Sequence, residues 1–158
     1  YEVRAFILKG TPRDTIAGIA CEIYEGNLLI PQDIENALEG CDYLIHAAAI
    51  TDVWPTKNPF SWKINYELVK NIASIVQKKG IKKYIHVGTA NSFGFGSPNE
   101  PGNEEKPFNS GKYGLDYITS KKAAQDFLLG EAKTESRLPV VVINPTFMIG
   151  DNDTKPGP

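Results

Sequence analysis

The hydrophobic positions along the chain gather into five short apolar runs, separated by polar segments and by longer stretches of helical period. Short runs rich in β-branched and aromatic residues are typical of buried strands. They cover residues 3–8, 19–24, 43–49, 84–87 and 140–143. Each run is long enough to cross a sheet once, so the chain is expected to contribute five strands.

Three segments between these runs place apolar residues at helical spacing, at 32–38, 60–79 and 113–132. The middle one is the longest, and Gly80 is expected to end it. Strands that alternate with helices predict right-handed βαβ units, hence an α/β fold with a parallel sheet. Residues 93–112 are rich in Gly, Pro, Asn and Ser and indicate a long loop, which in a compact domain is often functional.

The composition is that of an ordinary globular domain: 158 residues, 41% hydrophobic and 23% charged, with a net charge of −2. No apolar run reaches 18 residues and no basic-then-apolar leader is present, so neither a membrane span nor a secretory signal is expected. The balanced charge gives no reason to expect nucleic acid. Lysines 78, 79, 82 and 83 flank Gly80 and are interpreted as a solvated helix end.

Cys21 and Cys41, the two cysteines, lack the spacing of metal ligands. We expect no metal site and interpret both as small buried residues. This use of cysteine is compatible with a reducing, cytoplasmic location.

Tyr117 and Lys121 are the strongest candidates for chemistry, because residues four apart on a helix point from the same face. Tyrosine has a pKa of about 10, and half-ionising it near pH 7 requires about 4 kcal/mol of preferential phenolate stabilisation. The lysine and a second positive charge, such as an oxidised nicotinamide, could supply this. Thr89 adds a hydroxyl at the end of the 84–87 run, where open parallel sheets place their sites. Tyr66 and Lys70 share the spacing but lack such a partner, so a packing role is expected for them.

A set of short motifs, in order along the chain, resembles the extended short-chain dehydrogenase/reductases. They are Gly26-Asn27-Leu28, Ala47-Ala48-Ala49, Asn65, Gly88-Thr89-Ala90, Tyr117-x-x-x-Lys121 and Asn144-Pro145-Thr146. Residues 106–109 and 144–150 are most similar to the dihydroflavonol-reductase-like branch. The resemblance implies a doubly wound Rossmann sheet and an NAD(P) cofactor, and a homodimer is compatible with it.

The resemblance also implies roles for individual residues. Tyr117 would be the general acid/base, Lys121 would bind the nicotinamide ribose and lower the tyrosine pKa, and Thr89 would bind the substrate oxygen. Asn65 would support a proton-relay water, unless it is a polar residue facing solvent. The cofactor would be lined by the Ala47, Ala48 and Ala49 backbone, unless these residues only pack a strand, and by Pro145, Thr146 and Phe147.

Two positions depart from the family pattern at the adenosine end of the cofactor. Asn27, next to Leu28, stands where an Asp is common and would contact the adenine amino group. Lys9 ends the first strand, where an NAD-preferring domain has an acidic residue. With Arg13 close behind, this cation favours the 2′-phosphate of NADP, although NAD stays possible and a solvated loop is the alternative.

The Gly-rich turn that holds a pyrophosphate at a helix N-terminus does not occur in this sequence. We therefore interpret 1–158 as a partial dinucleotide-binding domain, running from the family's second strand through its sixth and the loop that follows. A first strand and a C-terminal substrate region would belong to a longer protein. In the order 3-2-1-4-5-6 the missing strand is central, so runs 3–8 and 43–49 should not pair directly.

The favoured function is an NADP-dependent oxidoreductase that moves a hydride between nicotinamide and a carbonyl or alcohol of a small organic substrate. One alternative is a nucleotide-sugar epimerase, which uses the same Tyr and Lys. A dehydratase is less favoured because Ala90 and Asn91 follow Thr89, where dehydratases commonly have Asp-Glu. Another alternative is a non-catalytic, cofactor-sensing protein, although such proteins usually lose the Tyr or the Lys.

Overall fold

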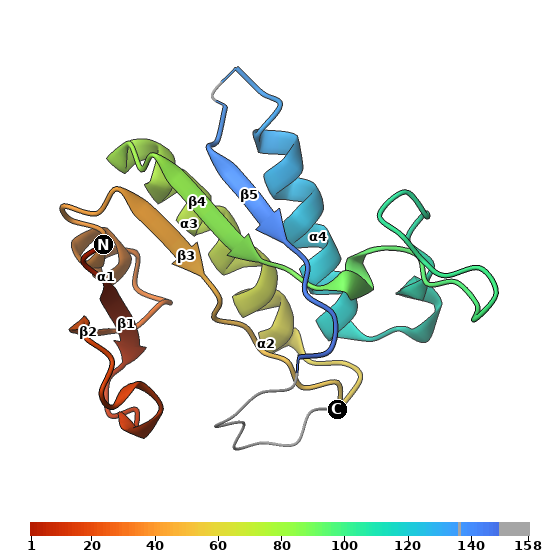
Figure 1. The fold of residues 1–158 in the computed structure, drawn as a ribbon, viewed down its shortest axis with the longest axis horizontal. Coiled ribbons are helices and arrows are strands. Elements are labelled where there is room, and N and C mark those ends of the chain that lie inside the picture. The colour runs from red at the N-terminus through yellow and green to blue at the C-terminus, as the bar shows by residue number, and fades with distance from the viewer. Residues whose placement is uncertain (136, 149–158) are drawn as a thin grey trace.

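The structure, a computed structural model, describes residues 1–135 and 137–148, apart from the side chain of Thr15 (Figure 1). Its five strands are all parallel to their neighbours and form two sheets. β1 (Arg4–Leu8) pairs with β2 (Glu22–Gly26), and β3 (Tyr43–His46), β4 (Lys83–Val87) and β5 (Val140–Ile143) form the second sheet in that order. The α/β class and the parallel pairing predicted from the sequence are confirmed.

Two strand boundaries differ from the prediction. β2 begins at Glu22 rather than at residue 19, because Gly18 takes a left-handed φ of 80° and Ile19 N bonds back to Ile16 O in a turn. β3 ends at His46, so the three alanines Ala47, Ala48 and Ala49 follow the strand instead of extending it. Apolar character alone did not separate the strand from the small residues beyond its end.

The long predicted helix is present but changes geometry near its start. α2 (Pro59–Trp62) runs through a π-helical turn (Lys63–Glu67) into α3 (Leu68–Lys79), which ends at Gly80 with φ 66° as predicted. α1 is Pro31–Ala37. α4 (Asp116–Glu131) begins three residues later than predicted, because Gly114 is left-handed and ends a preceding 3₁₀ turn, Ser110–Tyr113. Two further 3₁₀ turns are Asp14–Ile16 and Ala90–Ser92.

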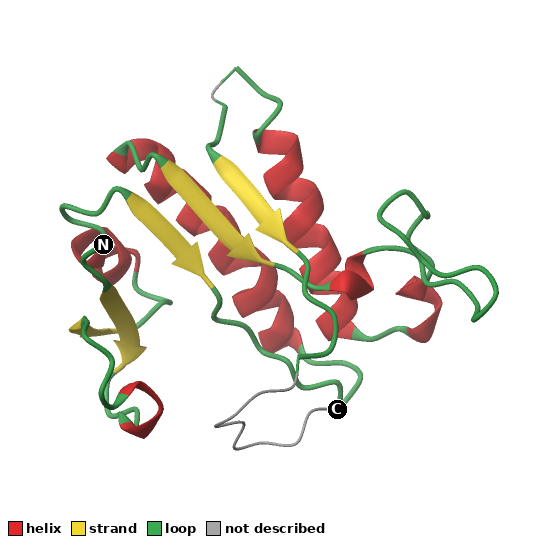
Figure 2. Ribbon diagram, in the orientation of Figure 1, coloured by secondary structure: helices red, strands yellow, loops and turns green. Residues whose placement is uncertain are grey.

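The core lies between the three-stranded sheet and the helices that cover one of its faces (Figure 2). Val69 and Val76 of α3, Tyr84 of β4 and Leu128 of α4 are fully buried there. Burying such an aliphatic side chain contributes about 1.5–3 kcal/mol. In the described part of the chain the opposite face is open, and the side chain of Ile45 on β3 is 66% exposed.

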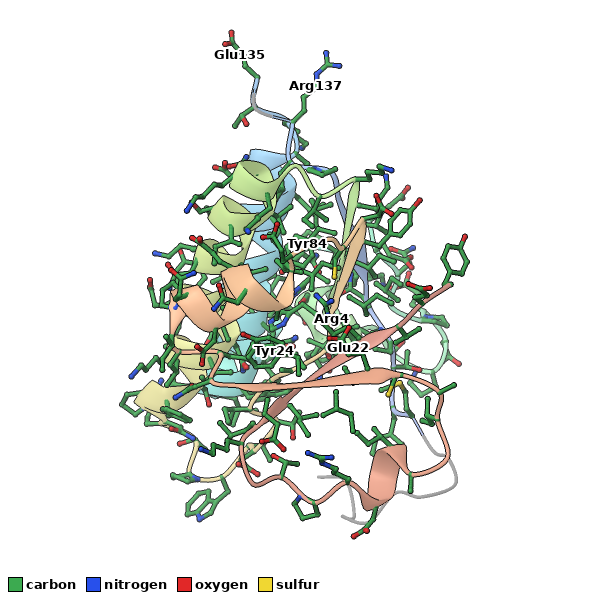
Figure 3. The ribbon with its side chains drawn as sticks, turned by 90° about the vertical axis from the view of Figure 1, so that its left-hand side faces the viewer. Arg4, Glu22, Tyr24, Tyr84, Glu135 and Arg137 are labelled. Atoms are coloured by element: carbon green, nitrogen blue, oxygen red, sulfur yellow. The ribbon has the colours of Figure 1, made fainter. Side chains whose placement is uncertain are left out.

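Arg4 joins the two-stranded sheet to the rest of the molecule. Its guanidinium bonds Glu22 on β2 and also donates to the carbonyl oxygens of Ala37 and Glu39 at the end of α1, both at 2.8 Å. Figure 3 shows Arg4 and Glu22 side by side. Because a helix leaves its last carbonyls without partners, Arg4 both caps α1 and fixes it to β1.

β1 and β3 do not pair with each other: among the described residues β1 bonds only β2, and β3 bonds only β4. The prediction that runs 3–8 and 43–49 are not ladder neighbours is therefore confirmed. The two sheets are connected instead through α1, which packs on α3 and is linked to it by the ion pairs Glu35–Lys78 and Glu39–Lys79. Lys78 and Lys79, at the end of α3, thus serve in these ion pairs, and Lys82 pairs with Asp42.

Candidate active site

A cleft of about 150 Å³ lies at the carboxyl ends of β3, β4 and β5. Figure 1 shows these three strands side by side, pointing the same way. The lining of the cleft combines small and apolar residues with several hydroxyl groups and the ammonium of Lys121. The described residues that line it are Ala47, Ala49, Thr51, Val87, Gly88, Thr89, Tyr117, Lys121, Pro145, Thr146 and Met148. The structure therefore brings the predicted Tyr117, Lys121 and Thr89 to one cleft from two separate elements.

Lys121 is 3% exposed, and its ammonium donates to Val87 O at 2.6 Å. Burial lowers the pKa of this lysine to about 8. Lys121 follows Tyr117 by about one helical turn on α4, and both side chains line the cleft.

Thr89 is held by the junction between β4 and β5. Its backbone N–H donates to Asn144 Oδ1 at 2.9 Å, and Ala90 N donates to Pro145 O. A Cβ at Gly88 would lie 2.2 Å from Asn144 Oδ1. Glycine is thus required at position 88 for the asparagine to hold Thr89 at the cleft, a constraint that the sequence pattern did not reveal.

Asn65, on the π-helical turn, is almost completely buried. Its Oδ1 accepts from Ile50 N at 2.9 Å, and its Nδ2 donates to Ile50 O at 2.9 Å and to Ser120 Oγ at 3.2 Å. The alternative of a polar residue facing water is therefore wrong. Asn65 does not line the cleft; it braces the segment after β3 against the helix that carries Tyr117 and Lys121.

Asp116, directly before Tyr117, makes a second brace that sequence reasoning missed. Its carboxylate accepts from Asn58 N at 2.8 Å and from Lys57 Nζ at 3.2 Å, and its own N–H donates to Thr56 O. Burial alone would raise the pKa of Asp116, but hydrogen bonds from Asn58, Lys57 and Trp62 outweigh it and hold that pKa below its usual range. No local pattern could signal these partners, because they lie almost 60 residues away along the chain.

The predicted cofactor-lining residues divide into two groups. Ala47, Ala49, Pro145 and Thr146 line the cleft, whereas Ala48 and Phe147 are exposed and do not. Ile149 and Gly150, the last two residues of the quoted motif, lie outside the described residues. Thr51, Val87 and Met148 were not predicted, although each lies close in sequence to a residue that was.

The residues predicted for the adenosine end lie at the other sheet. Lys9 is exposed in the turn after β1, and Asn27 and Leu28 are partly exposed after β2. Arg13 forms an ion pair with Glu25 at 2.6 Å, which reduces its availability for a 2′-phosphate. The Asn27 side chain accepts from Leu29 N and so shapes its own turn.

Several residues set aside from the chemistry behave as packing or surface groups. Tyr66 packs edge-on against Trp62, and Lys70 lies over the Tyr66 ring while pairing with Glu67. This confirms a packing role for the second Tyr/Lys pair. Cys21 and Cys41 are of intermediate exposure, so the prediction that both are buried is wrong. Arg4 approaches the Cys41 sulfur at 3.7 Å.

In the described residues, no His, Cys, Asp and Glu side chains gather in threes or more to hold a metal ion. No helix in the same part of the chain has the length and apolar character needed to cross a membrane.

The family model for the NAD dependent epimerase/dehydratase family matches residues 1–158. The chain belongs to this family. It is 25% identical over 155 residues to sterol demethylase protein B of Methylococcus capsulatus, covering 98% of this chain and 46% of that protein. It is also 25% identical over 158 residues to a putative dihydroflavonol 4-reductase of Synechocystis, covering 100% of this chain and 45% of that protein. The chain thus spans about half the length of these curated relatives.

Solved structures agree on the fold of this epimerase/dehydratase family chain. The structure of gox2253 superposes with a TM-score of 0.79 at 26% identity, covering 91% of this chain and 43% of that one. A UDP-glucose 4-epimerase from Thermus thermophilus, solved with NAD, superposes with a TM-score of 0.73 at 18% identity, covering 88% and 46%. At that identity the second likeness shows the Rossmann-type fold alone.

The residues at the cleft fit the nicotinamide end of the family's cofactor. Gly88, Ala47 and Ala49 present small surfaces that a flat ring and ribose can approach closely. The Lys121 ammonium and the Tyr117 hydroxyl supply hydrogen-bond donors suited to ribose hydroxyls. These are properties of the residues present in this chain.

Proposed function

We propose that the protein containing this chain is an NADP-dependent oxidoreductase acting on a carbonyl or alcohol of a small organic substrate. One observation carries the proposal: Tyr117, Lys121 and Thr89 line the same cleft, at the carboxyl ends of parallel strands. Residues 1–158 would be part of its dinucleotide-binding domain, from the second to the sixth strand of the family order. The separation of β1 from β3 supports that assignment.

A nicotinamide dinucleotide held at the cleft by Lys121 and Tyr117 would supply the hydride chemistry for the carbonyl carbon. Tyr117 donates its phenolic proton to the carbonyl oxygen and becomes a phenolate. Thr89 holds that oxygen, and Lys121 stabilises the phenolate charge. Near-neutral tyrosine chemistry needs about 4 kcal/mol of such stabilisation, and the buried ammonium of Lys121 acts where screening by water is small. In alcohol oxidation the phenolate takes the proton back.

The test exploits the two Tyr/Lys pairs of equal spacing. In the full-length protein, Tyr117→Phe should lower kcat for carbonyl reduction by two or more orders of magnitude, about the contribution of a general acid. Cofactor affinity should change little. Tyr66→Phe, the matched control, should keep near wild-type turnover. A Tyr117→Phe protein that retains most of its activity contradicts the assignment.

The preference for NADP rests on Lys9, an exposed cation after β1 with no acid at that strand end. Several of the solved neighbours hold NAD, so the preference needs its own test. Lys9→Glu should weaken NADP binding by about tenfold through repulsion of the 2′-phosphate and leave NAD affinity nearly unchanged. Exposed Lys133 provides the control Lys133→Glu. If Lys9→Glu leaves the NADP/NAD affinity ratio unaltered, Lys9 is only a surface residue.

Nucleotide-sugar epimerisation is the alternative, supported by the family to which the chain belongs. An epimerase transfers hydride and returns it, so it turns over with no net change in the cofactor, whereas the proposed reductase consumes NADPH with each carbonyl reduced. Two assays distinguish a reductase from an epimerase. One follows the loss of NADPH absorbance with a panel of ketones, and the other follows the formation of epimerised product from UDP-sugars. Sugar epimerisation without ketone-dependent NADPH loss would favour the alternative. A cofactor-sensing protein would show neither activity.

A further inference from the structure

Residues 51–58, between β3 and α2, form a loop that is tied at both ends to the helix carrying the proposed catalytic pair. At the start, Asn65 bonds both backbone groups of Ile50 and also Ser120 on α4. At the far end, Asp116 on α4 accepts from Asn58 N and donates its own N–H to Thr56 O. The two anchors on α4, Asp116 and Ser120, lie on either side of Tyr117 in the sequence.

The stretch between these anchors is short and begins in the cleft. Thr51 is a lining residue, and three residues of chain span at most about 11 Å. Trp54 therefore lies at most about that distance from Thr51 at the cleft, on a loop whose two ends are held near α4 by hydrogen bonds. Its side chain is 80% exposed. A tryptophan held in water on a fixed loop has no packing role in the described structure, unlike Trp62, which packs on Tyr66.

The neighbouring side chains indicate what kind of ligand group this position suits. Met148 lines the cleft and is largely exposed, which gives its mouth an apolar element. Lys57, the loop's cation, is paired with Asp116. Within the described lining, Lys121 is the one cation, and the proposed function already assigns it to Tyr117 and the cofactor ribose. Apolar surface without a further cation suits a hydrocarbon ring better than a sugar diphosphate.

We infer that Trp54 is a specificity-determining residue, whose indole packs against an aromatic or alicyclic ring of the carbonyl substrate. The inference rests on the proposed function for the position of the carbonyl, which Tyr117 and Thr89 would hold. Tryptophan suits this task because it offers a large rigid apolar face at a low cost in conformational entropy. An aromatic ring stacked on the indole gains binding free energy beyond that of burying apolar surface.

The experiment uses the full-length protein loaded with NADPH and separates binding from turnover. Flavanone is the ring-bearing ketone, and butanone is a small ketone without a ring. Flavanone affinity is measured by calorimetry in the non-reducing Tyr117→Phe background, with and without Trp54→Ala. Butanone reduction is measured with Tyr117 intact. Phe60→Ala removes a half-exposed aromatic from the adjoining α2 and is the matched control.

Trp54→Ala should weaken flavanone binding about five- to tenfold, as expected for one lost aromatic contact. Trp54→Phe should recover most of that loss, Phe60→Ala should cost less than twofold, and kcat/KM for butanone should stay within twofold. Equal flavanone affinity with and without Trp54, or no flavanone binding in the Tyr117→Phe background, overturns the inference. Flavanone that binds through Trp54 but is not reduced by the wild-type protein refutes the oxidoreductase proposal instead.

Discussion

His46 and His86 lie side by side on β3 and β4, at paired positions of the sheet and on its covered face. Their ring centroids are 5.5 Å apart. Burial, helped by the nearby positive charge of Lys121, lowers the pKa of His46 to about 4 and that of His86 to about 3. Both imidazoles are therefore neutral at pH 7, and Lys121 is the charged group next to this part of the core.

These two histidines predict an acid-sensitive fold. Their folded-state pKa values lie below the unfolded value of about 6.5, so the unfolded chain binds more protons between about pH 6.5 and 4. The contribution of the two neutral histidines to the free energy of unfolding is fully present above pH 6.5. As the pH drops through that window, the free energy of unfolding should fall by about 1 kcal/mol per pH unit for each histidine. Urea unfolding of the full-length protein at pH 7, 6 and 5 measures how the free energy of unfolding depends on pH. The double variant His46→Asn, His86→Gln should show a shallower loss, and an identical pH dependence would contradict the assignment.

Residue-level prediction from sequence succeeded where the relation between residues is local. Tyr117 and Lys121 share a helical face through a spacing of four, and Thr89 directly follows its strand, so their meeting at one cleft could be anticipated. Asp116 and Asn58 could not be paired in advance, since nothing in either segment specifies the other. Gly88 was quoted as a motif residue, but its reason, the approach of Asn144 Oδ1, depends on β5 lying beside β4.

At the scale of elements, the helix from Pro59 to Lys79 joins the core and the site. Its apolar stripe faces the sheet as the periodicity predicted, because Val69, Ile72 and Val76 recur at helical spacing. The π-helical turn within it was not predicted, since one extra residue in a turn near the start of the apolar stripe barely changes the spacing of the apolar residues. Such turns are frequent at functional sites, and here the turn presents Asn65 to Ile50 and Ser120.

Replacing Asn65 should therefore lower both the stability of the fold and the activity of the site. Asn65→Ala removes three hydrogen bonds and leaves the Ile50 N–H and C=O without this partner, which should cost about 2–4 kcal/mol of stability. The kcat for carbonyl reduction should fall too, because α4 is no longer braced. Asn71→Ala, at an exposed position of α3, should change either quantity only slightly. Thermal unfolding and steady-state kinetics of the two variants provide the comparison, and equal effects would show that the brace is unimportant.

At the scale of the whole molecule, the chain consists of a three-stranded sheet with its covering helices and a two-stranded sheet attached through α1. The alternation of strands and helices predicted the parallel α/β fold, and the family order predicted that β1 and β3 would not pair. The means of attachment was beyond sequence reasoning. Arg4 reads as one polar residue in an apolar run, and its partners at Ala37 and Glu39 appear only once α1 is packed.

This division predicts unequal protection from hydrogen exchange in the polypeptide 1–158. β4 is paired on both edges, whereas β1 and β2 are each paired on one in the described structure. The local opening that exposes the amides of β1 and β2 should therefore cost less free energy than that of β4, so these amides should exchange faster.

Arg4→Met should speed exchange in β1, β2 and α1 further and leave β4 unchanged, because it frees the carbonyls of Ala37 and Glu39. Arg13→Met is the matched control, since Arg13 pairs with Glu25 inside the two-stranded unit. Exposed ion pairs of that kind contribute about 0–1 kcal/mol, so little change is expected. Exchange followed by mass spectrometry at peptide resolution distinguishes the outcomes. Uniform protection across both sheets, or equal effects of the two arginine variants, would mean that the molecule opens as one unit and that Arg4 does not connect its parts.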